Sequence, residues 1–348
     1  MLKKKNNPVI PESDTTIGNL TGSYTTGNFT YSSSIDAISN LYAKYSYDAG
    51  LSNLPVLIIM HGFGGNTANI SSTTMNRYAS YKNFVVTVGM RGRDGASGSN
   101  DAGGREIYDI YDAIQYVITT FPVQTNENKI NIVGYSGGGG NVYSCLCRFP
   151  DLFNVGVSFF GISDYGYTLD GWYYQPADIS SMVGGTPAAV PNNYRARHSV
   201  EAINNFKNYL YMFHSPLDAD VNVKHSQRID TAYTGINKFY YEDQIYSHGY
   251  PENDADLVAA ESIFKNRLLI TNNTAITNIG TYRVIGWIKT KQFEVRLGTL
   301  NNHVVDLSYN ITNKTFIVTP LTGSQSVSIT YNSVTQTQTI NSQTTFQF

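Results

Sequence analysis

Short apolar runs alternate with segments of helical spacing along the first 270 residues. The continuous apolar runs, which are typical of strands covered on both faces, lie at residues 54–60, 84–88, 130–135, 155–160, 208–213 and 238–241. Residues 41–47 alternate between apolar and polar positions, as in a half-buried strand. Apolar residues recur at helical spacing in residues 105–121, 138–149 and 254–269. Strands that alternate with helices predict an α/β domain with a mostly parallel, doubly wound sheet.

The pattern changes after residue 271. Residues 271–274 have the composition of a linker, and three later segments alternate with period two: 293–297, 305–309 and 327–331. We therefore predict a small antiparallel, sandwich-like β-module over residues 275–348, ending in a polar tail rich in Gln, Thr, Ser and Asn. Residues 1–35 are rich in Gly, Thr, Ser and Asn and predict an irregular or loosely β arm. The α/β domain then spans residues 36–271.

One serine lies in a motif with a specific local geometry. The run at 130–135 ends in Gly134-Tyr135-Ser136-Gly137-Gly138, and a helical pattern follows. This is the layout of a nucleophile elbow, a sharp strand-to-helix turn that exposes a serine above the sheet. Glycine is expected at 134 and 138 because a Cβ at either position would clash with the neighbouring backbone. The motif alone fits a glycine-rich surface turn equally well.

A second glycine-rich segment supports the elbow interpretation. His61-Gly62-Phe63-Gly64-Gly65 directly follows the apolar run 54–60. In α/β-hydrolases, a loop of this kind supplies one amide of the oxyanion hole, and the residue after the serine supplies the other. Those amides belong to Phe63 and Gly137 here. Removing one such donor costs about 3 kcal/mol of transition-state stabilisation.

A general base and its orienting acid are expected in the order Ser, Asp, His. Asp218 follows the strand 208–213, and His248 follows the strand 238–241, so both lie where open α/β sheets gather their active sites. We assign His248 as the base that takes the Ser136 proton and Asp218 as the carboxylate that fixes its tautomer. Asp220 is the alternative acid. His214 is expected to support the turn that carries Asp218.

The segment from about residue 42 to 270 resembles an α/β-hydrolase, in particular the catalytic domains of the prolyl-oligopeptidase and dienelactone-hydrolase branches. The resemblance rests on the His-Gly loop, the serine elbow and the segments 91–92, 148–153, 161–164, 185–187, 197–199 and 214–221. In that family the pattern His-Gly-x-x-Asp-x-x-Val marks the acid, which falls on Asp218; Ser215 replaces the family's Gly. The resemblance implies a serine hydrolase. About forty residues precede the segment, so we expect no propeller, the domain that restricts such enzymes to short peptides.

Residues 162–200 form an insertion that we expect to cover the active site. It contains Tyr165, Tyr167 and the run Trp172-Tyr173-Tyr174. Aromatic rings offer flat apolar faces that stack on sugars or aromatic esters. We therefore predict that Tyr135, Trp172, Tyr173 and Tyr174 contact substrate. The alternative is that these aromatic rings only pack the insertion onto the domain.

Composition narrows the class of partner. The 348 residues carry a formal charge of -2, only 14% of them are charged, and 27 are Tyr. A net charge of -2 argues against a nucleic-acid partner, because proteins that bind nucleic acid usually carry an excess of basic residues. No apolar stretch is long enough to cross a membrane. We expect no secretory signal, because the basic cluster Lys3-Lys4-Lys5 is followed by no apolar run. A polar, weakly charged, Tyr-rich surface suits extracellular or virion-associated proteins and carbohydrate ligands. Cys145 and Cys147 are expected to be small core residues, and the sequence implies no metal or cofactor.

These observations predict hydrolysis of a carboxylic ester, such as an acyl group on a polysaccharide, through an acyl-enzyme. A serine peptidase acting on short peptides is the second interpretation. A non-catalytic glycan-binding or particle-assembly protein built on a hydrolase body is the third. The expected partner is a small-molecule or glycan ester, with no nucleic acid and no membrane insertion. The C-terminal module is a candidate for oligomerisation or attachment to a particle.

Overall fold

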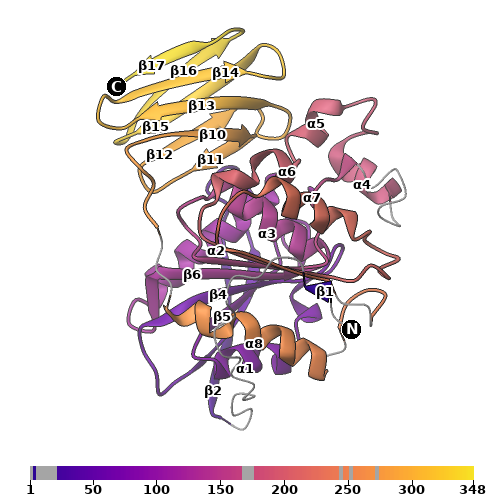
Figure 1. Cartoon of the computed structure of the whole chain (residues 1–348). Coiled ribbons are helices and arrows are strands. Elements are labelled where there is room, and N and C mark those ends of the chain that lie inside the picture. The colour runs from indigo at the N-terminus through magenta and orange to yellow at the C-terminus, as the bar shows by residue number, and fades with distance from the viewer. Residues whose placement is uncertain (1–2, 5–21, 167–175, 243–245, 251–253, 271–273) are drawn as a thin grey trace.

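The computed structural model describes residues 3–4, 22–166, 176–242, 246–250, 254–270 and 274–348. Its centre is a nine-stranded sheet with the strand order β1-β9-β8-β7-β6-β4-β5-β3-β2 (Figure 1). The strands are β1 (Lys3–Lys4), β2 (Tyr24–Tyr31), β3 (Leu41–Asp48), β4 (Leu54–Met60), β5 (Phe84–Val88), β6 (Thr125–Tyr135), β7 (Val155–Phe159), β8 (Tyr209–His214) and β9 (Lys238–Glu242). The six strands β9-β8-β7-β6-β4-β5, in their order in the sheet, run parallel to one another. At the two edges the pairing is antiparallel: β1 pairs with β9, β3 pairs with β5, and β2 pairs with β3.

Helices cover both faces of the sheet, which explains why β4, β5 and β7 are buried along their whole length. Helices α2 (Glu106–Thr120) and α3 (Gly137–Arg148) pack on one face, and α1 (Ser72–Ser80) and α8 (Ala255–Ile270) on the other (Figure 1). Side chains of β6 alternate between the two layers, with Ile132 in the first core and Val133 in the second. The predicted mostly parallel, doubly wound sheet is therefore present.

The remaining helices are short and lie toward the carboxyl ends of the strands or beside them. They are η1 (Thr67–Asn69), α4 (Pro176–Val183), α5 (Pro191–Arg195), α6 (Ser199–Ala202), η3 (Ile203–Asn205) and α7 (Lys224–Ala232). Among the described residues, no helix combines the length and apolar character needed to cross a bilayer. Cys145 and Cys147 are both buried free thiols in α3, and burial raises the pKa of Cys147 to about 12.

The N-terminal arm, predicted to be irregular or loosely β, contains a regular strand. Residues 24–31 form a regular strand, β2, that pairs with β3 along its whole length and closes one edge of the sheet. Gly27 and Asn28 hide the alternation in the sequence. Gly27 is needed here because the ring of Tyr45 occupies the space that a Cβ would fill, and Phe29 and Tyr31 turn inward on the next positions.

The C-terminal module is one eight-stranded antiparallel sheet, folded over on itself, with the order β16-β15-β12-β11-β10-β13-β14-β17. Its strands are β10 (Ile279–Ile285), β11 (Trp287–Lys289), β12 (Phe293–Leu297), β13 (Val304–Asn310), β14 (Thr315–Pro320), β15 (Gln325–Tyr331), β16 (Val334–Ile340) and β17 (Thr344–Gln347). Phe316 of β14 faces Tyr331 of β15 across the core, with ring centroids 5.6 Å apart. The predicted sandwich-like module is therefore confirmed in its architecture.

The polar tail of the predicted β-module, residues 334–348, contains two further strands, β16 and β17. Their Thr and Gln side chains satisfy one another across strands instead of packing in a core. Ser328 pairs with Thr337 and Thr330 with Thr335, each at 2.8 Å between hydroxyl oxygens. Thr also favours extended backbone because its Cβ is branched. The polar composition therefore concealed two strands.

The module and the α/β domain share one hydrophobic core. Trp287, which is fully buried, belongs to the same cluster as the residues of α2 and α3. The Arg148 guanidinium lies 4.3 Å above the Trp287 ring, and its Nε donates to the carbonyl of Ile285 at 3.1 Å. Tyr108 of α2 donates a hydrogen bond to Glu294 of β12. The module is thus packed into the body and is not loosely tethered to it.

Candidate active site

Ser136 lies at the turn between β6 and α3. Its backbone conformation, with φ 56 and ψ -120, is one that residues other than glycine rarely adopt. A Cβ on Gly134 would overlap the carbonyl of Gly138, and a Cβ on Gly138 would overlap the carbonyls of Met60 and His61. The predicted close approach of the backbone at both glycines is therefore present. The turn holds the Ser136 hydroxyl at the N-terminus of α3, which favours negative charge.

The structure brings the predicted base and acid to this serine. His248 Nε2 lies 3.1 Å from Ser136 Oγ, and His248 Nδ1 lies 2.7 Å from Asp218 Oδ2. Both distances are within hydrogen-bond range, so Nδ1–H donates to the carboxylate and leaves Nε2 as the acceptor for the hydroxyl proton. These side chains come from the loops after β6, β8 and β9, at the carboxyl ends of parallel strands of the same sheet.

Asp218 is held as a carboxylate by its surroundings. Burial acts to raise the pKa of Asp218, but hydrogen bonds from His214, His248 and the Val221 amide outweigh it and lower the pKa to about 2. The amides of Asp220 and Val221 donate to Oδ1 at 2.9 Å and 2.8 Å, which leaves Oδ2 directed at His248. A fixed, charged acceptor at this position selects the tautomer of His248.

His214 lies beside Asp218 and supports the turn that carries it. Its Nε2 lies 2.8 Å from the carbonyl of Val221 and 3.3 Å from Asp218 Oδ2, and its Nδ1 lies 2.8 Å from Ser226 Oγ. Asp220 contributes its backbone amide to Asp218, so the structure places Asp218, and not the alternative Asp220, against His248.

The two amides predicted for an oxyanion hole are neighbours. A Cβ placed on Gly137 would lie 2.6 Å from the backbone nitrogen of Phe63, so the loop 61–65 passes directly over the start of α3. Gly137 is the first residue of α3, where amides have no carbonyl partner within the helix. His61 Nδ1 lies 2.9 Å from the Gly62 carbonyl and holds the loop, and burial lowers the pKa of His61.

Phe160 is a site residue that the sequence pattern did not single out. It follows β7 with φ 42, and its ring packs edge-on against His248 at 4.8 Å between centroids. Phe160 also contacts Tyr250, two residues after His248. In the sequence it extends the apolar run 155–160 and was interpreted as part of the strand. The signal that could have found it is its position just past the strand end, next to the Gly161 turn.

Of the aromatic residues predicted to contact substrate, Tyr135 lies within the described residues. Trp172, Tyr173 and Tyr174 lie outside the described residues. Tyr135 stacks on Phe159 at 5.0 Å between centroids, and its hydroxyl lies 3.1 Å from that of Tyr78 in α1. Contact between Tyr135 and substrate stays a prediction.

Asp164 is not near His248 and has a structural environment. It pairs with His198 at 3.0 Å and with Arg228 at 2.8 Å. Burial acts to lower the pKa of His198, but Asp164 and Glu201 outweigh it and raise that pKa to about 9. Among the described residues, no group of His, Cys, Asp and Glu side chains is arranged to hold a metal ion.

Comparison with known proteins gives the family. Residues 76–264, more than half of the chain, match the model of the prolyl oligopeptidase family. An uncharacterised peptidase of Bacillus subtilis (strain 168) named YtmA is 24% identical over 186 residues, which cover 51% of this chain and 69% of that protein.

Two solved structures show the same fold at low identity. Acylaminoacyl peptidase of Pyrococcus horikoshii is 20% identical with a TM-score of 0.62, over 74% of this chain and 44% of that chain. The chain thus spans less than half the length of that peptidase. Acetyl xylan esterase 1 of Thermoanaerobacterium sp. JW/SL YS485 is 15% identical with a TM-score of 0.54, over 75% of this chain and 87% of that chain. The α/β-hydrolase fold is confirmed, and the chain belongs to the prolyl oligopeptidase family.

Proposed function

We propose that Ser136 is the nucleophile of an acyl-transfer reaction, with His248 as its general base and Asp218 as the residue that orients His248. The observation that carries this is the continuous hydrogen-bonded line from Ser136 Oγ to His248 Nε2 at 3.1 Å and from His248 Nδ1 to Asp218 Oδ2 at 2.7 Å. A nucleophile and base within hydrogen-bond reach, with the base oriented by a third group, is the arrangement that activates a serine.

The reaction proceeds in two halves. Ser136 Oγ forms a bond to the substrate carbonyl carbon while its proton passes to His248 Nε2, and the amides of Phe63 and Gly137 stabilise the oxyanion. His248 then gives the proton to the leaving group as its bond to carbon breaks. Water attacks the acyl-enzyme, again losing a proton to His248, and that proton returns to Ser136 Oγ as the acid leaves. No cofactor takes part in these steps.

We propose a carboxylic ester as substrate, with the acyl group carried by a polysaccharide. Binding the ammonium group of a peptide needs a carboxylate that is not already neutralised. Asp164 and Glu201, two carboxylates in or next to the insertion, are both held by His198 and by arginines. The low charge of the chain, 14% charged residues, also suits a carbohydrate ligand. The acetyl xylan esterase has a similar fold along most of its length.

The test compares release of acetate from acetylated xylan and turnover of p-nitrophenyl acetate with turnover of aminoacyl-p-nitroanilides. A kcat/KM for the esters at least about a hundredfold above that for the anilides is expected. Preference for the anilides would overturn the ester proposal and leave the nucleophile assignment standing.

A peptidase of short peptides is the second candidate. The family model is named for an oligopeptidase, and the Bacillus subtilis relative is described as a peptidase. The same Ser136 chemistry would serve an amide, since only the leaving group differs. Turnover of N-acylated peptide anilides, which carry no free ammonium, would favour this candidate over both an esterase and an aminopeptidase.

A further inference from the structure

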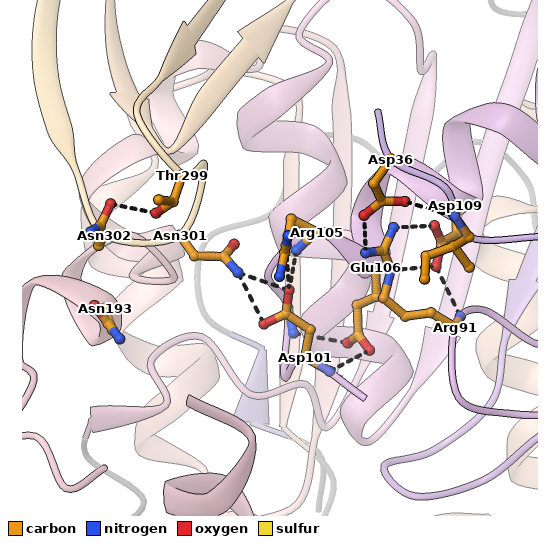
Figure 2. Close-up of polar contacts among 12 residues, drawn as sticks. Asp36, Arg91, Asp101, Arg105, Glu106, Asp109, Asn193, Thr299, Asn301 and Asn302 are labelled. Carbon is orange, nitrogen blue, oxygen red and sulfur yellow. Dashed lines mark hydrogen bonds and ion pairs between the residues drawn. The ribbon is translucent and has the colours of Figure 1, made fainter. Parts of the chain in front are cut away.

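A loop of the C-terminal module reaches the α/β domain close to the proposed site. Residues 298–303, between β12 and β13, bring Asn301 against Asp101, in the segment that connects β5 to α2 (Figure 2). Asn301 Nδ2 donates to both carboxylate oxygens of Asp101, at 3.3 Å and 3.0 Å. The carbonyl of Asn301 accepts a hydrogen bond from Arg197 at 3.1 Å.

Asp101 and Arg197 form a buried pair that ties together three parts of the chain. Arg197 donates to the Asp101 carboxylate and, at 3.1 Å, to its backbone carbonyl. The guanidinium also donates to the carbonyl of Asn193 in α5 at 2.8 Å. Asp101 accepts from the amide of Arg105 at 2.6 Å, just before α2. A buried ion pair tolerates little change at either partner, because an unpaired charge is costly there.

The residues after Asp101 are held in an unusual backbone conformation. Ala102 and Gly103 have φ 43 and φ 77, in the left-handed region that costs energy for a non-glycine residue. The Tyr165 ring occupies the space where a Cβ on Gly103 would lie, at 2.9 Å. Contacts on both sides therefore fix this short segment, and Tyr165 at the base of the insertion packs directly on it.

The same segment leads to the loops that carry the proposed site. Ala102 is buried in a small apolar cluster that also contains Ile179 and Val183 of α4, with Phe63 packed against it. Val221, whose amide donates to Asp218, belongs to this cluster as well. Helices α4 and α5, which we call the α4–α5 wall, therefore share one apolar cluster with Phe63 of the 61–65 loop and with Val221 beside Asp218.

We propose that Asn301 is a positioning residue, through which the C-terminal module sets the α4–α5 wall of the substrate site. Asn301 holds Asp101 and Arg197 through hydrogen bonds, and these two residues position the segment that carries Ala102 in the apolar cluster with Phe63. The proposal rests on the proposed function, in that the site bordered by this wall is the one that binds substrate. Loss of the contact moves the wall and weakens substrate binding, whereas Ser136, His248 and Asp218 keep their own contacts.

The test uses the full chain with Asn301→Asp and its neighbour Asn302→Asp as the matched control. Asn301→Asp places a second carboxylate against Asp101. Asn302 accepts a hydrogen bond from Thr299 of its own loop at 2.8 Å (Figure 2), so the same change of charge there leaves the Asp101–Arg197 pair intact. For p-nitrophenyl butyrate we expect Asn301→Asp to raise KM about fivefold, in the range of couplings through residues that touch no ligand, with kcat unchanged. Asn302→Asp should leave KM at the wild-type value.

A neutral substitution separates positioning from charge repulsion. Asn301→Ala removes both hydrogen bonds to the Asp101 carboxylate and leaves the Asp101–Arg197 pair in place, so KM should rise in the same direction as in Asn301→Asp. An unchanged KM in Asn301→Asp, or an equal rise in Asn302→Asp, would overturn the proposal.

A second readout does not depend on turnover. Amide hydrogen exchange over residues 176–200 should be faster in Asn301→Asp than in wild type and unchanged in Asn302→Asp. If the wild-type chain fails to turn over esters, the proposed function fails, and this exchange measurement still decides whether Asn301 holds the wall. Equal exchange in both variants and in wild type would refute the positioning role.

Discussion

The two ends of helix α3 are held by different kinds of contact. At its N-terminus, Gly137 and Gly138 let the backbones of the 61–65 loop and of β4 approach closely, and Ser136 is half-buried in a strained turn. At its C-terminus, the fully buried Arg148 lies over Trp287 of the module and donates to the carbonyls of Ile285 and Ala196. One end buries little side-chain area, and the other buries some of the largest side chains in the chain.

The difference between the two ends of α3 indicates that one end serves the proposed reaction and the other stabilises the fold. The Ser136 end depends on a few polar contacts aimed at one reacting group, and removing them leaves the core intact. The Trp287 end depends on packing and on the buried Arg148 guanidinium, which lies over the Trp287 ring and donates to backbone carbonyls. Substitutions at the first end should change rates, and substitutions at the second should change the free energy of unfolding.

The largest effect is expected from Ser136→Ala. Loss of the nucleophile should lower kcat for ester hydrolysis by about a millionfold, as for other enzymes whose serine, histidine and aspartate act as a unit. The free energy of unfolding should change by less than about 0.5 kcal/mol, because the hydroxyl fills no core space. Steady-state kinetics and urea unfolding measure the two quantities. A large loss of stability would show that the serine end is structural as well.

Trp287→Ala should give the opposite result. Removing a fully buried indole should cost about 3–5 kcal/mol of unfolding free energy, and it also leaves Arg148 without its aromatic partner. The kcat per active site, titrated with a fluorophosphonate, should stay within about twofold of wild type. Val334→Ala, at an exposed position of β16, is the control and should change stability by less than about 0.5 kcal/mol. Equal effects of the two substitutions would contradict a shared core.

The pH dependence of the unfolding free energy should reveal the ion pairs of His198 and Glu201, which lie next to the C-terminal module. The pKa of His198 is raised to about 9 from 6.5, and its partner Glu201 pairs with Arg283 of β10 at 2.7 Å. Stability from protonated His198 is therefore fully present below pH 6.5 and is lost as the pH rises toward 9. His198→Gln should flatten this alkaline decline in urea unfolding by about 2 kcal/mol. His303→Gln is the control and should leave the decline unchanged, because burial lowers the pKa of His303, whereas the pKa of His198 is raised to about 9.

The smallest effect is expected at Asp220, the alternative acid. Its backbone amide, which any residue keeps, is what contacts Asp218. Asp220→Asn should change kcat by less than about twofold, whereas Asp218→Asn should lower kcat by about ten-thousandfold through the wrong tautomer of His248. Comparable losses in the two variants would reopen the choice of acid.

The same contrast explains what could be predicted from the sequence. The elbow at Ser136 and the positions of Asp218 and His248 follow from local motifs at strand ends, and the structure brings those residues together. β2, β16 and β17 were missed because glycine or alternating Thr and Gln masks the apolar period. The contact between Asn301 and Asp101 joins residues 200 positions apart, and no local pattern marks it.

The most direct test of the central claim is the intact mass of the chain after exposure to a fluorophosphonate, with Ser136→Ala alongside. We expect one adduct on the wild-type chain and none on the variant, because only a serine activated by His248 attacks the phosphorus rapidly. A folded wild-type chain that stays unmodified, or a variant that gains the same adduct, would contradict Ser136 as the nucleophile.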